Sequence, residues 1–294
     1  MTDKRIFALG FFDGVHLGHQ ALLRACRELA DRLGAETAAI TFAAHPQSLF
    51  IQQVPPLINT LTDRQRLLLR YGMDHIYAFP VTKDVMSTDW RDFLDLLVEY
   101  GAAGFVCGDD FRFGNRGLGD GDKLKQYCEE RGFPCVIVPE QTMDDTRVSS
   151  TYIRSQIEAG DMATAVRFLG HPHILTGEVV SGRHLGRTLG IPTANMTIPT
   201  GVVVPKFGVY VCRVEIDGVV YPAVANVGTR PTVGGHRVTV EPWILDFDGD
   251  LYGREITLEF HRFLRPERKF DSLEALRQEI RKNAEETKEF FGKT

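Results

Sequence analysis

Residues 10–19 of the chain read Gly-Phe-Phe-Asp-Gly-Val-His-Leu-Gly-His, and the segments on either side of this stretch decide the fold. Residues 5–10 form a short apolar run, residues 21–33 carry apolar side chains at helical spacing, and residues 38–42 are again apolar and β-prone. A strand, a helix and a second strand in this order predict a βαβ unit, and therefore a parallel sheet with helices on its faces. The quoted stretch then follows the carboxyl end of the first strand, where ligands bind in open α/β sheets.

The same stretch has the residue types of a phosphate-binding loop. Gly10 and Gly18 let the backbone approach phosphate oxygens closely, and the start of a helix adds amide donors and the positive end of a dipole. His16 and His19, three residues apart, can face the same side and donate hydrogen bonds to a polyphosphate as pyrophosphate leaves. Two other interpretations stay open. One is a metal pair, although zinc histidines are more often four residues apart, and the other is two surface histidines in a glycine-rich turn.

Helices and strands continue to alternate through the first half of the chain. Helices are predicted at 64–71, 90–100 and 123–131, and strands at 75–79, 104–107 and 134–138. Two short helices follow. The first is capped within Ser-Ser-Thr at 149–151 and ends at Gly160, and the second is capped by Asp161 and ends at Gly170.

After His-Pro-His at 171–173 the periodicity becomes strand-like, which suits a domain boundary. Alternating segments are found at 208–216, 219–226, 238–247 and 256–260. Asp-Gly at 217–218 is a strong hairpin turn, and a second Asp-Gly follows at 248–249. Short strands at this spacing predict a small antiparallel barrel. Asp271, with Glu274 three residues later, predicts a capping box at the start of a final helix.

Composition limits the class of protein. The 43% hydrophobic and 25% charged residues are typical of an ordinary globular protein, and a net charge of -5 with a pI near 6.0 argues against nucleic-acid or membrane-surface binding through charge alone. Five cysteines, an odd number without CxxC spacing, argue against a disulfide framework or a structural zinc site. No stretch reaches the ~18 apolar residues of a membrane span, and the start is not a signal peptide. We expect a cytoplasmic location and small-molecule partners, with no nucleic acid and no membrane, and the oligomeric state stays open.

A second candidate phosphate element lies at 147–154, Arg-Val-Ser-Ser-Thr-Tyr-Ile-Arg. Hydroxyls and amides at a helix start, with an arginine at each end, can clamp a phosphate, although Ser-Ser-Thr by itself is only a good helix cap. Together with His-Leu-Gly-His, this element resembles the two-part signature of the HxGH nucleotidyltransferase superfamily. The resemblance implies adenylyl transfer from ATP with His16 and His19 as the catalytic residues. The ATP contacts that it implies are Gly10, Phe11, Phe12, Asp13, Gly18, Arg147, Ser149, Ser150, Thr151 and Arg154.

Two further segments resemble the flavin-side segments of bacterial FAD synthetases, the FMN adenylyltransferase branch of that superfamily. They are Thr-Phe-Ala-Ala-His-Pro at 41–46 and Gly-Asp-Asp-Phe-Arg-Phe-Gly at 108–114. Their aromatic side chains can offer an isoalloxazine ring a stacking surface, and Asp110 can address its polar edge. Each phenylalanine can equally be an ordinary core residue. The flavin contacts implied in this domain are Phe42, Asp110, Phe111 and Phe113.

The second half of the chain has a glycine-rich run of its own at 177–190, followed by Ile-Pro-Thr-Ala-Asn at 191–195. It has no GxxxxGK[ST] and is therefore not a P-loop. The whole run resembles the riboflavin kinase signature, in which Pro-Thr-Ala-Asn supplies a threonine and an asparagine to the metal–nucleotide complex. Thr193 and Asn195 are then the metal ligands, and their oxygens suit Mg²⁺. Gly182, Gly186 and Gly190 would permit a flap over ATP; the alternative is a barrel turn that happens to contain asparagine.

Segments 208–210, 226–232 and 241–247 also resemble the riboflavin kinase family. By this resemblance Glu241 is the base that accepts the proton of the ribityl 5′-hydroxyl, whereas outside this context it would be a solvent-facing strand glutamate. Arg265 lies in a segment that resembles the one closing the flavin site, although an Arg-rich run is more often a solvated face. Two positions depart from the family. Pro242-Trp243 stands where a histidine commonly follows the glutamate by two residues, and Lys282-Asn283 stands near a frequent aspartate.

The resemblance to bacterial bifunctional riboflavin kinase/FMN adenylyltransferases, or FAD synthetases, extends from Gly10 to about Phe270. It implies a Rossmann-like α/β nucleotidyltransferase domain at 1–169 and a small antiparallel β-barrel kinase domain with a C-terminal helix at 170–294. Riboflavin would be phosphorylated to FMN, and FMN adenylylated to FAD with release of pyrophosphate, with Mg²⁺ accompanying ATP and with FMN and FAD as ligands. Two alternatives stay open: adenylylation of another phosphate monoester, as in pantetheine-phosphate enzymes, and a non-catalytic flavin-binding or regulatory protein.

Overall fold

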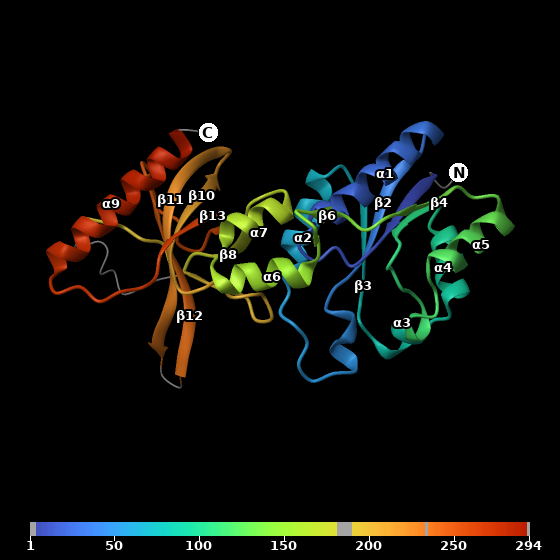
Figure 1. Cartoon of the computed structure of the whole chain (residues 1–294), viewed down its shortest axis with the longest axis horizontal. Coiled ribbons are helices and arrows are strands. Elements are labelled where there is room, and N and C mark those ends of the chain that lie inside the picture. The colour runs from blue at the N-terminus through green and yellow to red at the C-terminus, as the bar shows by residue number, and fades with distance from the viewer. Residues whose placement is uncertain (1–3, 181–189, 233–234, 293–294) are drawn as a thin grey trace. The chain divides into compact units, whose positions relative to one another are not determined.

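The protein consists of two compact units. The computed structural model describes residues 4–180, 190–232 and 235–292. The units are Met1–Leu57 with Leu61–Ser150, and Ile58–Thr60 with Thr151–Thr294. Each unit has its own sheet (Figure 1).

The first unit contains a five-stranded sheet in the order β3-β2-β1-β4-β5. Its strands are β1 (Arg5–Leu9), β2 (Glu36–Phe42), β3 (His75–Phe79), β4 (Ala102–Gly108) and β5 (Cys135–Val138). Every pairing is parallel, which confirms the predicted α/β class. The strand order runs outward from β1 in both directions, so the carboxyl end of β1 is the topological switch point where such sheets bind ligands.

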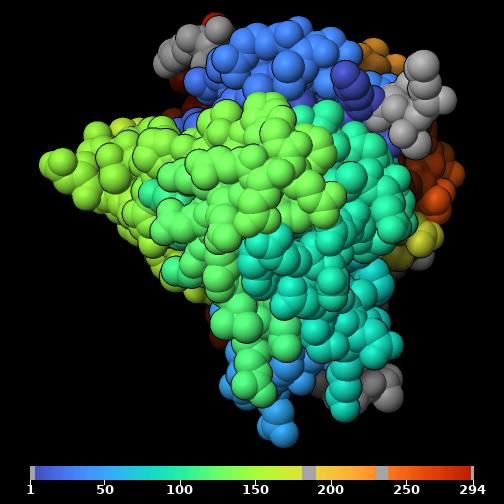
Figure 2. Space-filling model, turned by 90° about the vertical axis from the view of Figure 1, so that its right-hand side faces the viewer, coloured from blue at the N-terminus to red at the C-terminus, as the bar shows by residue number. Residues whose placement is uncertain are grey.

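Helices cover both faces of this sheet (Figure 1). They are α1 (Leu17–Leu33), α2 (Leu61–Arg70), α3 (Lys83–Ser87), α4 (Trp90–Glu99) and α5 (Gly121–Arg131), with short 3-10 turns at Pro46–Leu49 and Asn115–Gly117. Phe7 and Leu9 of β1 join Leu94 and Leu124 of α4 and α5 in one buried cluster, because alternate strand residues face the same side. Helices α4 and α5, in teal and green, form the outer face seen in Figure 2. A small hairpin, β6 (Thr142–Met143) and β7 (Thr146–Arg147), precedes the second unit.

Helix α1 begins four residues earlier than the predicted start at residue 21. The apolar pattern pointed to the later start, because Gly18, His19 and Gln20 carry no apolar side chain. The helix nevertheless starts at Leu17, because His16 caps it. It ends at Gly34, whose φ of 60° is left-handed and suits glycine.

Two short helices, α6 (Ser150–Ala159) and α7 (Met162–Leu169), pack almost wholly with the second unit. Asp161 caps α7 by accepting from the backbone N–H of Thr164 at 3.1 Å, as predicted. The predicted division between residues 169 and 170 falls at the end of α7, and it stays a prediction.

The rest of the second unit is a six-stranded antiparallel barrel with a C-terminal helix, which confirms the predicted fold class (Figure 1). Its strands, in the order β8-β13-β10-β11-β12-β9, are β8 (His173–Glu178), β9 (Met196–Thr197), β10 (Gly208–Ile216), β11 (Val219–Thr232), β12 (Gly235–Ile244) and β13 (Glu255–Arg265). The final helix is α9 (Leu273–Gly292). In the ranges that the structure describes, no helix is long and apolar enough to cross a bilayer.

The two Asp-Gly turns of the barrel have different outcomes. Asp217 and Gly218, with φ of 53° and 79°, join β10 to β11 as a hairpin, as predicted. The second, at 248–249, joins no hairpin, because β13 pairs with β10 and β8 and not with β12.

The predicted capping box of the last helix is wrong by one residue. The Oγ of Ser272, and not the side chain of Asp271, caps α9 by accepting from the backbone N–H of Ala275 at 3.1 Å. Because the helix begins at Leu273, Glu274 is its second residue and not the third that a capping box requires.

The barrel contains an isolated histidine. His173 on β8 is 1% exposed, and within the described ranges neither ring nitrogen has a hydrogen-bond partner. Its ring packs on Phe260 with the ring centroids 5.7 Å apart. Burial, with a smaller contribution from His171, lowers the pKa of His173 from 6.5 to about 3. The imidazole is therefore neutral in the folded protein at pH values that protonate it in an unfolded chain.

This difference predicts that acid destabilises the second unit. Between pH 6.5 and about 3 the unfolded chain binds a proton at His173 that the folded chain does not bind, so the free energy of unfolding falls as the pH falls. At about 1.4 kcal/mol per pH unit, His173 lowers the free energy of unfolding by about 2 kcal/mol between pH 6.5 and pH 5. This loss of unfolding free energy can be measured by urea titration at several pH values. In a Trp90→Phe background the fluorescence of Trp243 follows the unfolding of the second unit. His173→Phe should lose this component, and an unchanged pH dependence in that variant would refute the assignment.

Candidate active sites

His16 and His19 lie together at the N-terminal end of α1. The Nδ1 of His16 accepts from the backbone N–H of His19 at 3.3 Å, and the two rings stack with their centroids 3.7 Å apart. A Cβ atom at Gly18 would lie 3.2 Å from the His16 ring, so glycine leaves the ring its space. Both imidazoles therefore lie where a helix presents its free amides and the positive end of its dipole.

The charge state of His19 follows from its surroundings. Burial lowers the pKa of His19 well below its usual value, and the neighbouring His16 and Arg64 lower it further. Within the described ranges, the Nδ1 of His19 has no hydrogen-bond partner. Near pH 7 the ring is therefore neutral and can donate one hydrogen bond to a phosphate without carrying a charge.

The loop before the two histidines has a tightly fixed backbone. Phe12 and Val15 have φ of 58° and 41°, in the left-handed region that side chains other than glycine rarely adopt. A Cβ at Gly10 would lie 2.9 Å from the Phe12 ring. Phe12 and Asp13 are 0% and 2% exposed, so neither side chain lies on the surface of the loop.

The second phosphate element reaches the same loop. The Oγ of Ser150 donates to the backbone carbonyl of Asp13 at 2.8 Å, across 137 residues of sequence. Arg147 is half exposed and forms ion pairs with Asp110 and with Glu140, the latter at 2.7 Å. Two predicted site residues, the Arg147 of the nucleotide clamp and the Asp110 of the flavin segment, are thus in direct contact.

The remaining residues of the clamp lie around the start of α6. Ser149 directly precedes the helix, whereas Thr151 and Arg154 belong to the second unit. Arg154 is buried at 9% exposure.

The predicted flavin residues lie beyond the carboxyl ends of β2 and β4, the two neighbours of β1. Phe42 ends β2 and is half-buried, and Phe111 is half-buried after β4. Phe113 stacks on Phe111 at 5.9 Å but is only 6% exposed and packs against Phe93. Because Phe113 is buried, it is less suited than Phe111 to stack on a ligand.

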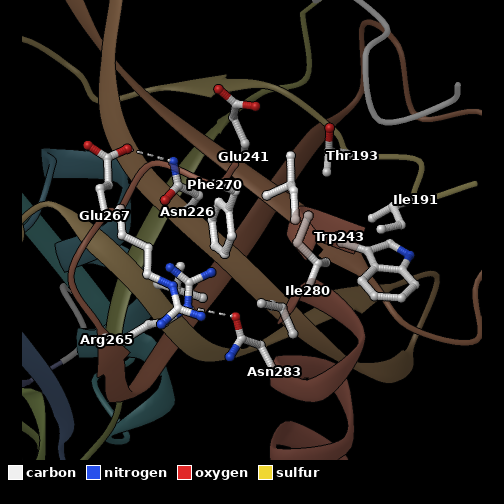
Figure 3. Close-up of a pocket in the computed structure, with 14 residues that line it drawn as sticks. Ile191, Thr193, Asn226, Glu241, Trp243, Arg265, Glu267, Phe270, Ile280 and Asn283 are labelled. Carbon is white, nitrogen blue, oxygen red and sulfur yellow. Dashed lines mark hydrogen bonds between the residues drawn. The ribbon is translucent and has the colours of Figure 1, made fainter. Parts of the chain in front are cut away.

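The second unit contains a cavity of about 370 Å³ between the barrel and α9 (Figure 3). Glu241 of β12 and Thr193 lie along one edge of it, and Arg265 and Asn283 lie at the opposite edge. The apolar wall between them includes Ile191, Trp243 and Ile280. Three of the predicted kinase residues, Thr193, Glu241 and Arg265, therefore line one pocket.

Asn195, two residues after Thr193, is not among the residues that line this pocket. The backbone N–H of Ala194 donates to the carbonyl of Pro242 at 2.9 Å, which fastens the Pro-Thr-Ala-Asn segment to the strand of Glu241. Asn195 is 5% exposed, and its Oδ1 has no hydrogen-bond partner within the described ranges. A buried amide oxygen without a donor is costly, and a hard cation is a partner that would satisfy it.

Asn226 and Glu267 line the pocket but were not identified from the sequence as site residues. Asn226 of β11 lies opposite Glu241 in the β11–β12 ladder, and its Nδ2 donates to Glu267 at 3.0 Å. A side chain at Gly228 would collide with Glu267, so the glycine makes room for this contact. Asn226 and Glu267 are far apart in sequence, and only the folded barrel brings them together.

Arg265 is held by α9. Its Nε donates to the Oδ1 of Asn283 at 3.1 Å and forms an ion pair with Glu279 at 3.2 Å. Burial lowers the pKa of Arg265, and the Glu279 carboxylate opposes this shift. Arg265 therefore has one neutral partner, Asn283, and one carboxylate partner, Glu279, one turn earlier on α9.

The predicted flap glycines are only partly within the described structure. Gly182 and Gly186 lie outside the described residues. Gly190 has a φ of 69° and open space around its Cβ position.

Comparison with known protein families also divides the chain into two parts. The FAD synthetase family model matches residues 1–152, and the riboflavin kinase model matches residues 169–291. A solved structure titled as a macrolide-efflux protein from Streptococcus pneumoniae has a TM-score of 0.87 and 31% identity, and the match covers 98% of this chain and 94% of that one.

Curated relatives match over nearly the whole chain. The bifunctional riboflavin kinase/FMN adenylyltransferase of Listeria monocytogenes is 34% identical, with 99% of this chain and 94% of that protein covered. The Escherichia coli protein of the same name is 36% identical, with 98% and 93% covered. The chain belongs to the family of bifunctional riboflavin kinase/FMN adenylyltransferases.

Proposed function

We propose that the second unit phosphorylates riboflavin with Glu241 as the base, and that the first unit adenylylates the resulting FMN at His16 and His19. The observation that carries the proposal is the pocket in which Thr193, Glu241 and Arg265 converge. The product of the second unit is the substrate of the first, so the chain converts riboflavin to FAD at the expense of two ATP molecules.

In the kinase step, the Glu241 carboxylate accepts the proton of the ribityl 5′-hydroxyl as that oxygen attacks the γ-phosphorus of ATP. A new oxygen–phosphorus bond forms, the bond from the γ-phosphorus to the bridging oxygen breaks, and ADP leaves. Thr239 supports the base, since its Oγ1 lies 3.4 Å from the Oε1 of Glu241. The apolar wall of Ile191, Trp243 and Ile280 suits an isoalloxazine ring, and Arg265 lies at the far edge.

Thr193 fits a magnesium ion, as does the Oδ1 of Asn195, which has no partner among the residues that the structure describes. With ATP bound, Mg²⁺ would neutralise part of the phosphate charge beside Glu241. This chain's own contribution is to hold the two oxygen donors on a segment that Ala194 fastens to β12.

In the adenylyl step, a phosphate oxygen of FMN attacks the α-phosphorus of a second ATP, and pyrophosphate leaves. His16 and His19 donate hydrogen bonds to the phosphate oxygens on which negative charge grows, so no covalent enzyme intermediate is needed. Arg147 reaches phosphate by exchanging its contacts with Asp110 and Glu140 for contacts with the nucleotide. Phe42 and Phe111 provide the flavin surface.

We further propose a cytoplasmic enzyme with small-molecule partners only. Its five cysteines are all free, which is consistent with a reducing compartment.

Magnesium titration tests the role of Asn195. Asn195→Ala should raise the Mg²⁺ concentration for half-maximal FMN formation by about tenfold or more, because a buried oxygen ligand is lost. The KM for riboflavin and the conversion of FMN to FAD serve as internal controls and should stay unchanged. An unaltered Mg²⁺ dependence would exclude Asn195 as a ligand.

A further inference from the structure

Arg64 on α2 is 0% exposed and heads the fully buried side chains by volume. Burying a guanidinium is costly unless it is paired and hydrogen-bonded. Within the described ranges, its Nε and Nη2 have no hydrogen-bond partner, and its Nη1 makes the contacts. The fold retains this costly group at one place, the junction between the nucleotide loop and the end of β2.

The contacts of Arg64 join two segments that bind different substrates. Its Nη1 donates to the carbonyl of Phe11 at 3.1 Å, to the Oγ1 of Thr41 at 2.9 Å and to the carbonyl of Phe42 at 2.9 Å. The Thr41 hydroxyl in turn donates to the Phe11 carbonyl at 2.7 Å. The guanidinium also lies over the Phe11 ring, 4.5 Å from its centroid.

Regular strand pairing ends where these contacts begin. The last residue pair of the β1–β2 ladder is Leu9 with Ile40. The backbone N–H of Gly10 still donates to the backbone carbonyl of Ile40 at 3.4 Å. Beyond that point the side chains of Arg64 and Thr41 connect the two segments. The left-handed Phe12 follows directly, and a strained residue persists only where its surroundings fix it.

Arg64 also acts on the charges of the loop. Asp13, which is 2% exposed, counteracts the fall in the pKa of Arg64 that burial causes. The Arg64 charge contributes to the low pKa of His19.

We propose that Arg64 is a positioning residue for adenylyl transfer, which fixes the nucleotide loop at 10–19 to the flavin-side end of β2. The loop holds the α-phosphate of ATP and the end of β2 holds the FMN ring, so one buried guanidinium sets the distance between the two reacting groups. The inference rests on the proposed function of the first unit. Lysine cannot replace it fully, because an ammonium lacks the flat face with which the guanidinium lies on the Phe11 ring.

The test compares Arg64→Met, Arg64→Lys and Thr41→Val with Arg70→Met, an exposed arginine on the same helix. For each, kcat and KM are measured with FMN and ATP, together with the riboflavin kinase rate of the same chain. Arg64→Met should lower kcat for FMN adenylylation about 100-fold, since small displacements of reacting groups have effects of this size. Both KM values should change less than about threefold, and the kinase rate should stay within about twofold.

The conservative variants separate positioning from folding. Arg64→Lys should regain part of the kcat for FMN adenylylation that Arg64→Met loses. Thr41→Val should lower this kcat about tenfold. Arg70→Met should keep the wild-type kcat. A wild-type kcat in Arg64→Met would overturn the inference. If that variant fails to fold, a wild-type kcat in Thr41→Val overturns it. Failure of the wild-type chain to make FAD from FMN would instead contradict the proposed function.

Discussion

Glu241→Ala should stop FMN formation while the same chain still converts added FMN to FAD. A positioned general base contributes about 10²–10⁴-fold to a rate, so the kinase turnover should fall by that factor. Glu241 lies in the pocket of the second unit, whereas His16 and His19 belong to the first. Chromatography of riboflavin, FMN and FAD after incubation with ATP and Mg²⁺ measures both reactions.

The matched control is Glu215→Ala. Glu215 is an exposed glutamate on β10 and does not line the cavity. The Glu215→Ala variant should therefore carry out both reactions at the wild-type rate. A Glu241→Ala protein that still phosphorylates riboflavin at the wild-type rate would remove Glu241 from the mechanism.

His19→Ala should have the opposite effect, with FMN accumulating from riboflavin and little FAD formed. Loss of one preorganised donor to a developing negative charge lowers a rate about 10²–10³-fold. The cap of α1 should survive, because the His16 side chain accepts from the backbone of residue 19 and not from its ring. The rate of FAD formation from added FMN is the measurement.

His75→Ala is the control for this variant. His75 lies on β3, and its ring bonds to Glu36 at 2.7 Å on the same unit but outside the loop. Loss of both activities in a folded His19→Ala protein would contradict the assignment of separate sites.

Each short motif of the sequence is local, so its residues lie close together in the structure. His16 and His19 lie on one turn at a helix start, and Thr193 lies on the segment that Ala194 fastens to the strand of Glu241. Strand and helix patterns also gave the two fold classes.

Contacts between distant segments could not be predicted in the same way. The pairing of β13 with β10 and β8 is invisible to a turn motif, so the Asp-Gly at 248–249 suggested a turn without showing which strands pair. Phe111 and Phe113 have the same chemistry and lie in one short segment after β4, and only packing buries the second.

Arg64 was missed although the sequence carries a signal for it. Leu67 and Leu68 follow it by three and four residues, so the arginine lies on the apolar face of its helix and not on the solvent face. A charged residue on such a face must find partners inside the protein. Asn283 shows the same pattern on α9, where Ile280 precedes it by three residues and Thr287 follows by four.

The central claim, two separable sites in one chain, is tested most directly by mixing the two inactive variants. Equimolar Glu241→Ala and His19→Ala proteins receive riboflavin, ATP and Mg²⁺, and the flavins are resolved by chromatography over time. We predict that each protein alone makes little FAD from riboflavin, whereas the mixture makes much more, because FMN released by the His19→Ala chain is adenylylated by the Glu241→Ala chain. A mixture that stays at riboflavin, or that stops at FMN, would contradict the account.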